Sequence, residues 1–383
     1  MESSPLKLPV PTPAAGADAY IREKELALAH DPRRRENYRR YQAFKRTGEG
    51  LDFLPVKLDI ENVSRCNFRC TMCQVSDWKK GQRAADMPLE AFKKLLDQQY
   101  GAIEVKLQGM GEPLLQRDDF FEMIKYARRT HIWIRTTTNA SLLHFRENYR
   151  KLIDADPNEV QISIDGANKD VFEKIRRGSR FDVVTKNCRL INDYCDAQSV
   201  VRTKMWVVVQ KDNRHQLKDL VDLAARLGFR SLCFSLTLTG WGQDKWQKQN
   251  EEVGAGDSVP FDTCFEMVER GARMGVDVAF WDIGSKFNTR SPSGLCNWPF
   301  ERAYVSSDLR VVPCCMIANP EALDLGDASD FTVAWNGEAY RAFRRAHLDG
   351  DIPKQCMACY ESSGDAPQAK IMKRMSMPLR QKL

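Results

Sequence analysis

Cysteine is the residue type that says most about chemistry in this sequence. The 383-residue chain holds 12 cysteines. Its N-terminus lacks a basic stretch followed by an apolar one, so we expect a cytoplasmic protein whose thiols stay reduced. Clustered cysteines in that compartment bind metal or do redox chemistry. The first group is Cys66, Cys70 and Cys73, the second is Cys296, Cys314, Cys315, Cys356 and Cys359, and the scattered Cys188, Cys195, Cys233 and Cys264 are interpreted as small buried hydrophobes.

The first group has the spacing C-x3-C-x2-C and directly follows a predicted strand. Such a loop brings the thiolates of Cys66, Cys70 and Cys73 close together. Three thiolates suit three irons of a cubane cluster and leave the fourth iron open. A tetrahedral zinc site needs four ligands, and no fourth Cys or His lies nearby in the sequence. An open iron is a position that a small molecule with an amine and a carboxylate can chelate.

The second group is gathered from three segments. Cys296, Cys314, Cys356 and Cys359 together can ligate a second cubane fully. A structural zinc site is the alternative, because a C-x2-C pair with two further cysteines also describes one. Neighbours on a strand point to opposite faces, so we expect Cys314 to be the ligand and Cys315 to be a core or substrate-side residue.

The elements that must position these cysteines alternate along the chain. Short β-rich runs are followed by amphipathic runs of helical length, which implies parallel strands joined by right-handed crossovers. The pattern fits an open sheet or a partial barrel of the TIM type, and in both the loops after the strand C-termini build the active site. Predicted strands are 56–62, 102–107, 132–137, 159–164, 201–209, 231–235 and 276–280, and predicted helices are 89–100, 120–129, 183–194, 216–227 and 260–274.

Composition shifts divide the chain into five parts. The start is rich in Pro, Ala and Ser, which predicts disorder, and a highly charged helical extension follows it. The strand–helix alternation then runs until about Gly284, after which shorter strands and one helix predict a small second domain. The boundaries are 1–17, 18–50, 51–284, 285–362 and, for a basic tail, 363–383.

The overall composition argues against several classes of protein. A hydrophobic fraction of 43% rules out global disorder, and the sequence has no run of about 18 apolar residues, so we expect no membrane partner. The 58 basic and 52 acidic residues are interleaved, which argues against a polyanion ligand. A zinc-stabilised nucleic-acid-binding protein remains an alternative of another class, and it predicts a one-sided basic face with stacking aromatics.

The first cysteine motif and its place after the first strand resemble the radical S-adenosylmethionine (SAM) superfamily, over about residues 54–362. The resemblance implies an α/β fold, a partial (β/α)6 TIM-type barrel, and a [4Fe-4S] cluster on Cys66, Cys70 and Cys73 that binds SAM. The second group is similar to the small auxiliary-cluster domain of that superfamily, the twitch or shortened SPASM domain. Full SPASM domains need seven or more cysteines, so the resemblance implies a single auxiliary [4Fe-4S] cluster on Cys296, Cys314, Cys356 and Cys359.

The same resemblance implies contacts to SAM. Met72 stands where the family usually has an aromatic residue that touches the adenine. A Gly-Met-Gly-Glu sequence stands at the family's GGE-like motif, which accepts bonds from the SAM ammonium. Polar residues at the ends of later strands match positions that contact the ribose and carboxylate, and Arg202 or Lys204 matches the basic residue that pairs with that carboxylate. The expected SAM-binding residues are therefore Met72, Gly109, Gly111, Glu112, Asn139, Ser163, Asp165 and Arg202.

The reaction that the resemblance implies is reductive cleavage of SAM to a 5′-deoxyadenosyl radical, which abstracts hydrogen from a substrate C–H bond. Aminocyclitol dehydrogenases resemble this cysteine arrangement best, so we expect oxidation of a sugar-type or aminocyclitol alcohol, with the auxiliary cluster as electron acceptor. The implied partners are that small-molecule substrate and a reducing protein such as flavodoxin or ferredoxin. A peptide-modifying maturase or an epimerase is the alternative. The ~50 residues before the barrel are too few and too charged for the peptide-binding domain that such enzymes often carry.

Overall fold

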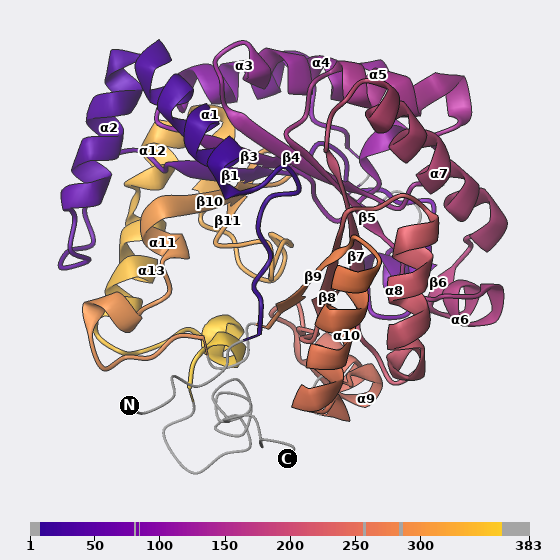
Figure 1. Ribbon diagram of the computed structural model, residues 1–383. Helices are drawn as coiled ribbons and strands as arrows, with labels where there is room; N and C mark the ends of the chain where they lie inside the picture. The colour runs from indigo at the N-terminus through magenta and orange to yellow at the C-terminus, as the bar shows by residue number, and fades with distance from the viewer. Residues whose placement is uncertain (1–7, 80–81, 84, 256–257, 283–285, 362–383) are drawn as a thin grey trace, which may run out of the picture.

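The computed structural model of the protein describes residues 8–79, 82–83, 85–255, 258–282 and 286–361. Its main feature is a curved 10-stranded sheet with helices on the outer face (Figure 1). All seven strands predicted for the barrel are confirmed, and neighbouring members of this set pair in parallel. They are β1 (Lys57–Ile60), β3 (Glu104–Leu107), β4 (Trp133–Thr138), β5 (Glu159–Ser163), β7 (Thr203–Val208), β8 (Ser231–Ser235) and β9 (Asp277–Trp281).

The predicted crossover helices are confirmed as α3 (Leu89–Gln98), α4 (Asp118–Arg128), α7 (Phe181–Ala197), α8 (Leu217–Arg226) and α10 (Phe261–Arg273). Each buries an apolar stripe against the sheet, as Phe92, Leu95 and Leu96 do in α3. Among the described helices between β1 and β9, three were not predicted: α5 (Asn148–Asp154), α6 (Lys169–Ile175) and α9 (Asp244–Val253). Of the helices that the structure describes, none has the length and apolar character that crossing a membrane requires.

Strand alternation gives the barrel an apolar outside and a polar inside. Leu58 and Val105 face the helices and are fully buried. The next residues, Asp59 and Lys106, therefore face the interior. Lys106 and Trp206 of β7 both keep partial exposure, so the interior is more open to solvent than the layer between sheet and helices. A partial barrel with polar walls is the result.

The C-terminal part continues the same sheet. β10 (Arg302–Val305) pairs in parallel with β1, and β11 (Arg310–Val312) and β12 (Gly326–Asp327) follow in antiparallel order. Within the described ranges, β9 and β10 do not pair, so the barrel stays open between them. The expected boundary at residue 284 is thus no break in the sheet, since β10 satisfies the free edge of β1. Helices α11 (Trp298–Glu301), α12 (Phe331–Trp335) and α13 (Glu338–Leu348) complete this part.

The N-terminal extension forms α1 (Ala17–His30) and α2 (Pro32–Ala43), as the charged helical pattern predicts. The expectation of disorder for residues 1–17 is wrong for the part described, from Leu8 onward. The carbonyl of Pro9 accepts a bond from the N–H of Phe280 in β9, and Leu8 is buried. A Pro-rich segment lacks its own ladder donors, but its carbonyls still bind an open sheet edge. The basic tail 363–383 lies outside the described residues.

Candidate active site

The first cysteine group lies at the carboxyl end of β1. Cys66 is in the loop after that strand, and Cys70 ends the two-residue strand β2 (Arg69–Cys70). β2 pairs with β6 (Arg176–Arg177), so Cys70 and Arg176 are register partners. Cys73 precedes a short 3-10 helix, and its N–H donates to the carbonyl of Cys70. The motif therefore forms one compact loop at the end of the barrel where parallel strands place active sites.

Nitrogen donors surround the sulfurs of this loop. The backbone N–H of Phe68 donates to Sγ of Cys66 at 3.4 Å. Nδ2 of Asn139 lies 3.9 Å from the same sulfur, and a guanidinium nitrogen of Arg176 lies 4.0 Å from Sγ of Cys70. Burial raises the pKa of the Cys66 thiol to about 12, and it raises the pKa of Cys70 and Cys73 as well. A metal centre that binds these cysteines would have to displace their protons.

Gly109 and Gly111, in the loop predicted to contact SAM, allow close packing of that loop against the segment after β1. A Cβ on Gly111 would lie 2.3 Å from the carbonyl oxygen of Val63 and 2.5 Å from that of Arg65. A Cβ on Gly109 would overlap the side chain of Glu61 at 2.0 Å. Both glycines therefore let the loop after β3 press directly against the segment that leads into Cys66.

The buried carboxylate of Glu112 bonds the loop after β3 to the end of β4. Its carboxylate accepts bonds from the Thr138 hydroxyl at 2.6 Å, the Asn139 N–H at 2.7 Å and the Leu114 N–H at 3.3 Å. Burial raises the pKa of Glu112 to about 7, against the lowering effect of these donors. The three bonds tie the ends of β3 and β4 together, next to the cysteine loop.

Asn139 and Asp165 lie at the same end of the barrel. Nδ2 of Asn139 donates to Oδ1 of Asn67 at 2.9 Å, inside the cysteine loop. Asp165 is fully buried, forms an ion pair with Arg176 at 2.7 Å and accepts a bond from the N–H of Val208. Ser163, which ends β5, is half-buried. The structure thus brings these predicted positions together and adds Arg176, which the sequence had not singled out.

Arg202 is not part of this assembly. It precedes β7, so it lies at the amino ends of the strands, opposite the cysteine loop. Its guanidinium pairs with Asp156, which precedes β5 at that same end. Lys204, the other residue considered for this role, pairs with Glu159 at 2.8 Å near the same end. The expectation failed because a basic residue that opens a strand stands one strand length away from the carboxyl-end loops.

Met72 is buried, and the segment that contains α9 covers its backbone. The carbonyl of Met72 accepts bonds from Nε1 of Trp241 at 3.1 Å and from Nδ2 of Asn250 at 3.4 Å. The polar segment 241–253, which contains α9, therefore packs onto the cysteine loop, and we call this segment the α9 clamp.

The second cysteine group assembles at the other side of the barrel mouth. The N–H of Cys296 donates to the hydroxyl of Tyr360 at 2.9 Å, which ties it to the Cys356–Cys359 segment. Burial and then the neighbouring thiols, in the order Cys315, Cys356, Cys359 and Cys296, raise the pKa of Cys314. After burial, the strongest influences on the pKa of Cys315 are Asp59 and Lys106 of the barrel interior.

A shared interior joins the two cysteine groups. Val75, Met110, Val312 and Ile317 belong to one buried apolar cluster, against which Cys66, Cys73, Cys314 and Cys315 all pack. Gln74, which follows the last cysteine of the first loop, is 1% exposed. Its Nε2 donates to the carbonyl of Ile317 at 3.3 Å. Neither the cluster nor Gln74 is marked in the sequence by anything except adjacency to the motif.

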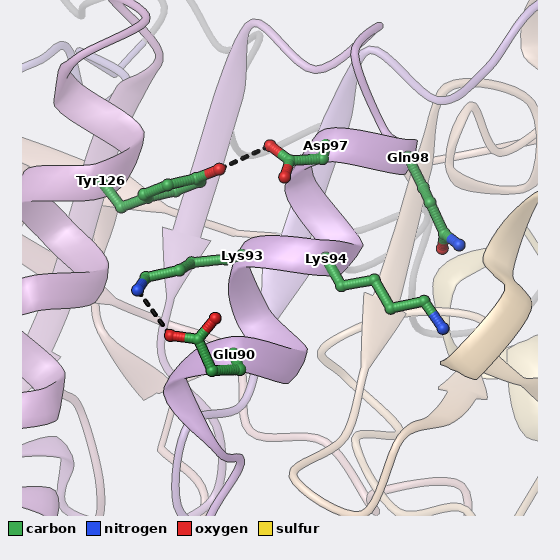
Figure 2. A pocket seen from close by; sticks show the side chains of 6 residues that line it. All are labelled: Glu90, Lys93, Lys94, Asp97, Gln98 and Tyr126. Carbon is green, nitrogen blue, oxygen red and sulfur yellow. Dashed lines mark hydrogen bonds and ion pairs between the residues drawn. The ribbon is translucent and has the colours of Figure 1, made fainter.

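A hollow of about 530 Å³ on the outer surface is a separate feature (Figure 2). It lies between α3 and α4, away from both cysteine groups. Two pairs of its lining residues bond to each other: Lys93 pairs with Glu90 at 2.6 Å, and the Tyr126 hydroxyl donates to Asp97 at 2.6 Å.

The donor set of the first loop fits an iron–sulfur centre. N–H groups from Phe68, Asn139 and Arg176 point toward sulfur, and such donors stabilise thiolates. In the described part of the chain, no three His, Cys, Asp or Glu side chains converge closely enough to hold a single metal ion. The cysteines instead form two looser groups, one on each side of the apolar cluster.

Comparison with known families agrees with this geometry. Residues 62–224 match the radical SAM superfamily, and residues 296–360 match the SPASM iron-sulfur cluster-binding domain. Over these residues the chain is similar to radical SAM proteins and to SPASM-type iron-sulfur domains. The two matches imply that the cofactors are SAM, a [4Fe-4S] cluster that binds SAM, and [4Fe-4S] binding in the auxiliary domain.

Two named relatives show how far the likeness extends. The chain is 32% identical over 201 residues to the mycofactocin maturase MftC of Mycolicibacterium smegmatis, covering 51% of this chain and 48% of that protein. It is 33% identical over 134 residues to the GTP 3′,8-cyclase of Aliarcobacter butzleri, covering 33% and 39% respectively. The chain thus matches about half or less of the length of these relatives.

Solved structures share the fold. The structure of Streptococcus suis SuiB bound to the precursor peptide SuiA superposes with a TM-score of 0.61 at 16% identity, over 81% of this chain and 71% of that one. The structure of anSMEcpe with bound AdoMet and a peptide gives a TM-score of 0.59 at 19% identity, over 84% and 96%. At these identities the matches show the fold alone, a partial α/β barrel continued by a smaller C-terminal part.

Proposed function

We propose that this enzyme modifies a peptide. The observation that carries the proposal is the 32% identity to MftC, which is named as a maturase. This proposal replaces the alcohol oxidation favoured by the cysteine pattern, because curated relatives of this chain are named as maturases. The charged N-terminal extension, which seemed to argue against a peptide substrate, forms α1 and α2 and packs on the barrel beside β1 and β4.

The proposed ligands of the SAM-binding cluster are Cys66, Cys70 and Cys73, and those of the auxiliary cluster are Cys296, Cys314, Cys356 and Cys359. The chemistry that the first centre and SAM supply when bound is reductive cleavage to methionine and a 5′-deoxyadenosyl radical. The chain's own part is to orient and shield. The segment with α9 bonds to the backbone of the cysteine loop at Met72, and Arg176, held by the buried Asp165, lies 4.0 Å from Sγ of Cys70.

Glu112, Asn139, Ser163 and Asp165 remain the proposed SAM-side residues, with Met72, Gly109 and Gly111 as supports of the same loops. In the described structure, Glu112 and Asp165 already hold the loops in place through their own bonds. Their proposed role is therefore to position the backbone that SAM meets. Nδ2 of Asn139 lies 3.9 Å from Sγ of Cys66, which places this residue beside the cysteine motif.

A second candidate function is oxidation of an alcohol carbon. The observation in its favour is that the thiols of Cys356, Cys359 and Cys296 act on the pKa of Cys314, so that four cysteines group together, while Cys315 packs against the apolar cluster that contains Tyr304 of β10. That arrangement allows one fully ligated auxiliary centre beside the substrate space, which suits an electron acceptor. A reducing protein such as flavodoxin or ferredoxin would supply the first electron in either case.

Product analysis separates the two functions. Anaerobically reconstituted enzyme is incubated with dithionite and SAM, and with either a panel of ribosomally encodable peptides or a panel of amino sugars. Formation of 5′-deoxyadenosine together with a mass change in a peptide supports the maturase. A loss of two hydrogens from an amino sugar, with every peptide unchanged, overturns the maturase in favour of alcohol oxidation.

A further inference from the structure

A row of polar side chains crosses three adjacent strands inside the barrel. Asp59 of β1 is the register partner of Tyr304 in β10 and of Lys106 in β3. Register partners in parallel strands point to the same face, which here is the interior. Asp59 is 1% exposed, and neither of its carboxylate oxygens accepts a hydrogen bond from any residue that the structure describes.

The other inward-facing acids have close partners. Glu104 pairs with Arg135 and Arg302, each at 3.0 Å. Glu159 pairs with Lys204 at 2.8 Å, and Glu61 pairs with Arg83 at 2.7 Å. Asp59 has only a loose ion pair at 3.6 Å with Arg302, which Glu104 holds more closely. A buried carboxylate without hydrogen bonds is costly, so its two free oxygens indicate a missing partner.

The two register partners of Asp59, Tyr304 and Lys106, also have polar groups without a hydrogen-bond partner among the described residues. The hydroxyl of Tyr304, a residue that is 1% exposed, has no hydrogen-bond partner among the described residues. Lys106 is half-buried and forms no hydrogen bond or ion pair through its ammonium within the same ranges. One free acceptor, one free hydroxyl and one free ammonium thus lie in a single row. Their charges balance, so the row complements an uncharged group that both donates and accepts hydrogen bonds, which is the property of a hydroxyl.

The opposite wall of the barrel is aromatic. Trp206 of β7 and Trp281 of β9 face the interior with ring centroids 6.4 Å apart, and both keep partial exposure. Indole faces bind flat or cyclic groups. Cys315 adjoins the polar row, because it packs against the buried cluster to which Tyr304 belongs.

We propose that Asp59, Tyr304 and Lys106 bind a hydroxyl group carried on a ring of the substrate. This proposal rests on the proposed function for the existence of a substrate in the barrel, and it adds the chemistry that the substrate must present. The ring can come from a phenolic side chain of a peptide or from a sugar-like molecule. Asp59 accepts the bond from the hydroxyl, and the ammonium of Lys106 donates to its oxygen.

The test measures binding to the full-length, anaerobically reconstituted enzyme by saturation-transfer NMR titration. The probes are N-acetyltyrosinamide, N-acetylphenylalaninamide, which lacks the hydroxyl, and methyl glucoside. The wild type is expected to bind the tyrosine probe about tenfold more tightly than the phenylalanine probe. Asp59→Asn should remove that preference and leave the affinity for the phenylalanine probe unchanged, whereas the exposed control Asp52→Asn should keep it. Methyl glucoside distinguishes the two sources of the ring. If the wild type binds methyl glucoside more tightly than N-acetyltyrosinamide, and Asp59→Asn abolishes that binding, the ring belongs to a sugar-like substrate.

Three outcomes would overturn the proposal: no binding of either hydroxylated probe at millimolar concentration, an unchanged preference in Asp59→Asn, or an equal loss for both amide probes. Thermal unfolding and iron content of Asp59→Asn verify that the variant folds. Because no SAM cleavage is needed to measure binding, failure here is distinguishable from failure of the proposed function. An enzyme that cleaves SAM and modifies peptides without the hydroxyl preference contradicts only the role of Asp59.

Discussion

Nδ2 of Asn319 donates a hydrogen bond of 3.2 Å to Oε1 of Gln74, and both side chains are almost fully buried. Gln74 directly follows the first cysteine motif, and Asn319 lies in the loop after Cys314 and Cys315. The same Oε1 accepts a bond of 2.8 Å from Gln243. One amide therefore joins the SAM-binding loop, the auxiliary segment and the α9 clamp.

Gln74→Leu should lower the free energy of unfolding by about 2 kcal/mol, because Asn319 and Gln243 lose a buried acceptor. Denaturant titration of the metal-free chain measures this change. Gln198→Leu, at the exposed end of α7, is the matched control and should change stability little. Equal losses of unfolding free energy in the two variants would show that the hydrogen bonds to Oε1 of Gln74 do not stabilise the fold.

Cys314→Ser should remove about four of the ~8 irons expected for two cubanes, while Cys315→Ser should leave the iron count unchanged. The reason is that, after burial and Cys315, the thiols of Cys356, Cys359 and Cys296 raise the pKa of Cys314, whereas after burial the charges of Asp59 and Lys106 act most on the pKa of Cys315. Iron and zinc analysis after anaerobic reconstitution checks this prediction. Iron loss in the Cys315 variant alone would reverse the assignment, and zinc bound in place of the second cubane would remove the electron-acceptor role.

Arg176→Met should destabilise the metal-free protein by about 3–5 kcal/mol, because it leaves Asp165 charged and buried without its partner. The double variant Arg176→Met/Asp165→Asn should recover part of that loss. Chemical unfolding of the two single variants and the double variant gives the coupling energy. Strictly additive losses would mean that the pair at 2.7 Å has no energetic coupling.

Glu112 should make stability depend on pH. Burial raises its pKa from an ordinary 4.5 to about 7 in the folded chain, so the folded state holds the proton more tightly than the unfolded state. Stability from this group is therefore greatest below pH 4.5 and is lost as pH rises to about 7, by about 3 kcal/mol.

Glu112→Gln cannot ionise, so its stability relative to the wild type should improve steadily across that interval. Unfolding free energies of the two metal-free proteins at several pH values measure the difference. A constant difference between them would mean that Glu112 is not the group whose proton affinity changes.

The barrel and its cysteine loops could be predicted from the sequence because their signals are local. Each predicted strand shows β-rich runs next to amphipathic helical patterns, and the C-x3-C-x2-C spacing identifies the first loop by itself. The choice of Cys314 over Cys315 rested on strand alternation, but β11 ends at Val312, so neither cysteine lies on a strand and the choice stays a prediction.

Long-range contacts account for what the sequence did not show. Arg176 reaches Cys70 only because β6 pairs with β2, and nothing in a two-residue strand signals that pairing. Arg202 was misplaced because a basic residue before a strand does not reveal at which end of the barrel it acts. The polar interior was visible as alternation in segments such as 57–61 and 104–108, but unpaired Asp59 could be recognised only after its neighbours were found paired with others.

The central claim is that a three-cysteine loop at the end of β1 supports reductive cleavage of SAM. The direct measurement is 5′-deoxyadenosine and methionine formed by anaerobically reconstituted, dithionite-reduced enzyme with SAM, compared with the variant Cys66→Ala/Cys70→Ala/Cys73→Ala. The wild type should release both products, and the variant should release neither while keeping about half of the iron. A fully iron-loaded wild type that leaves SAM intact, or a triple variant that still cleaves it, would contradict the account.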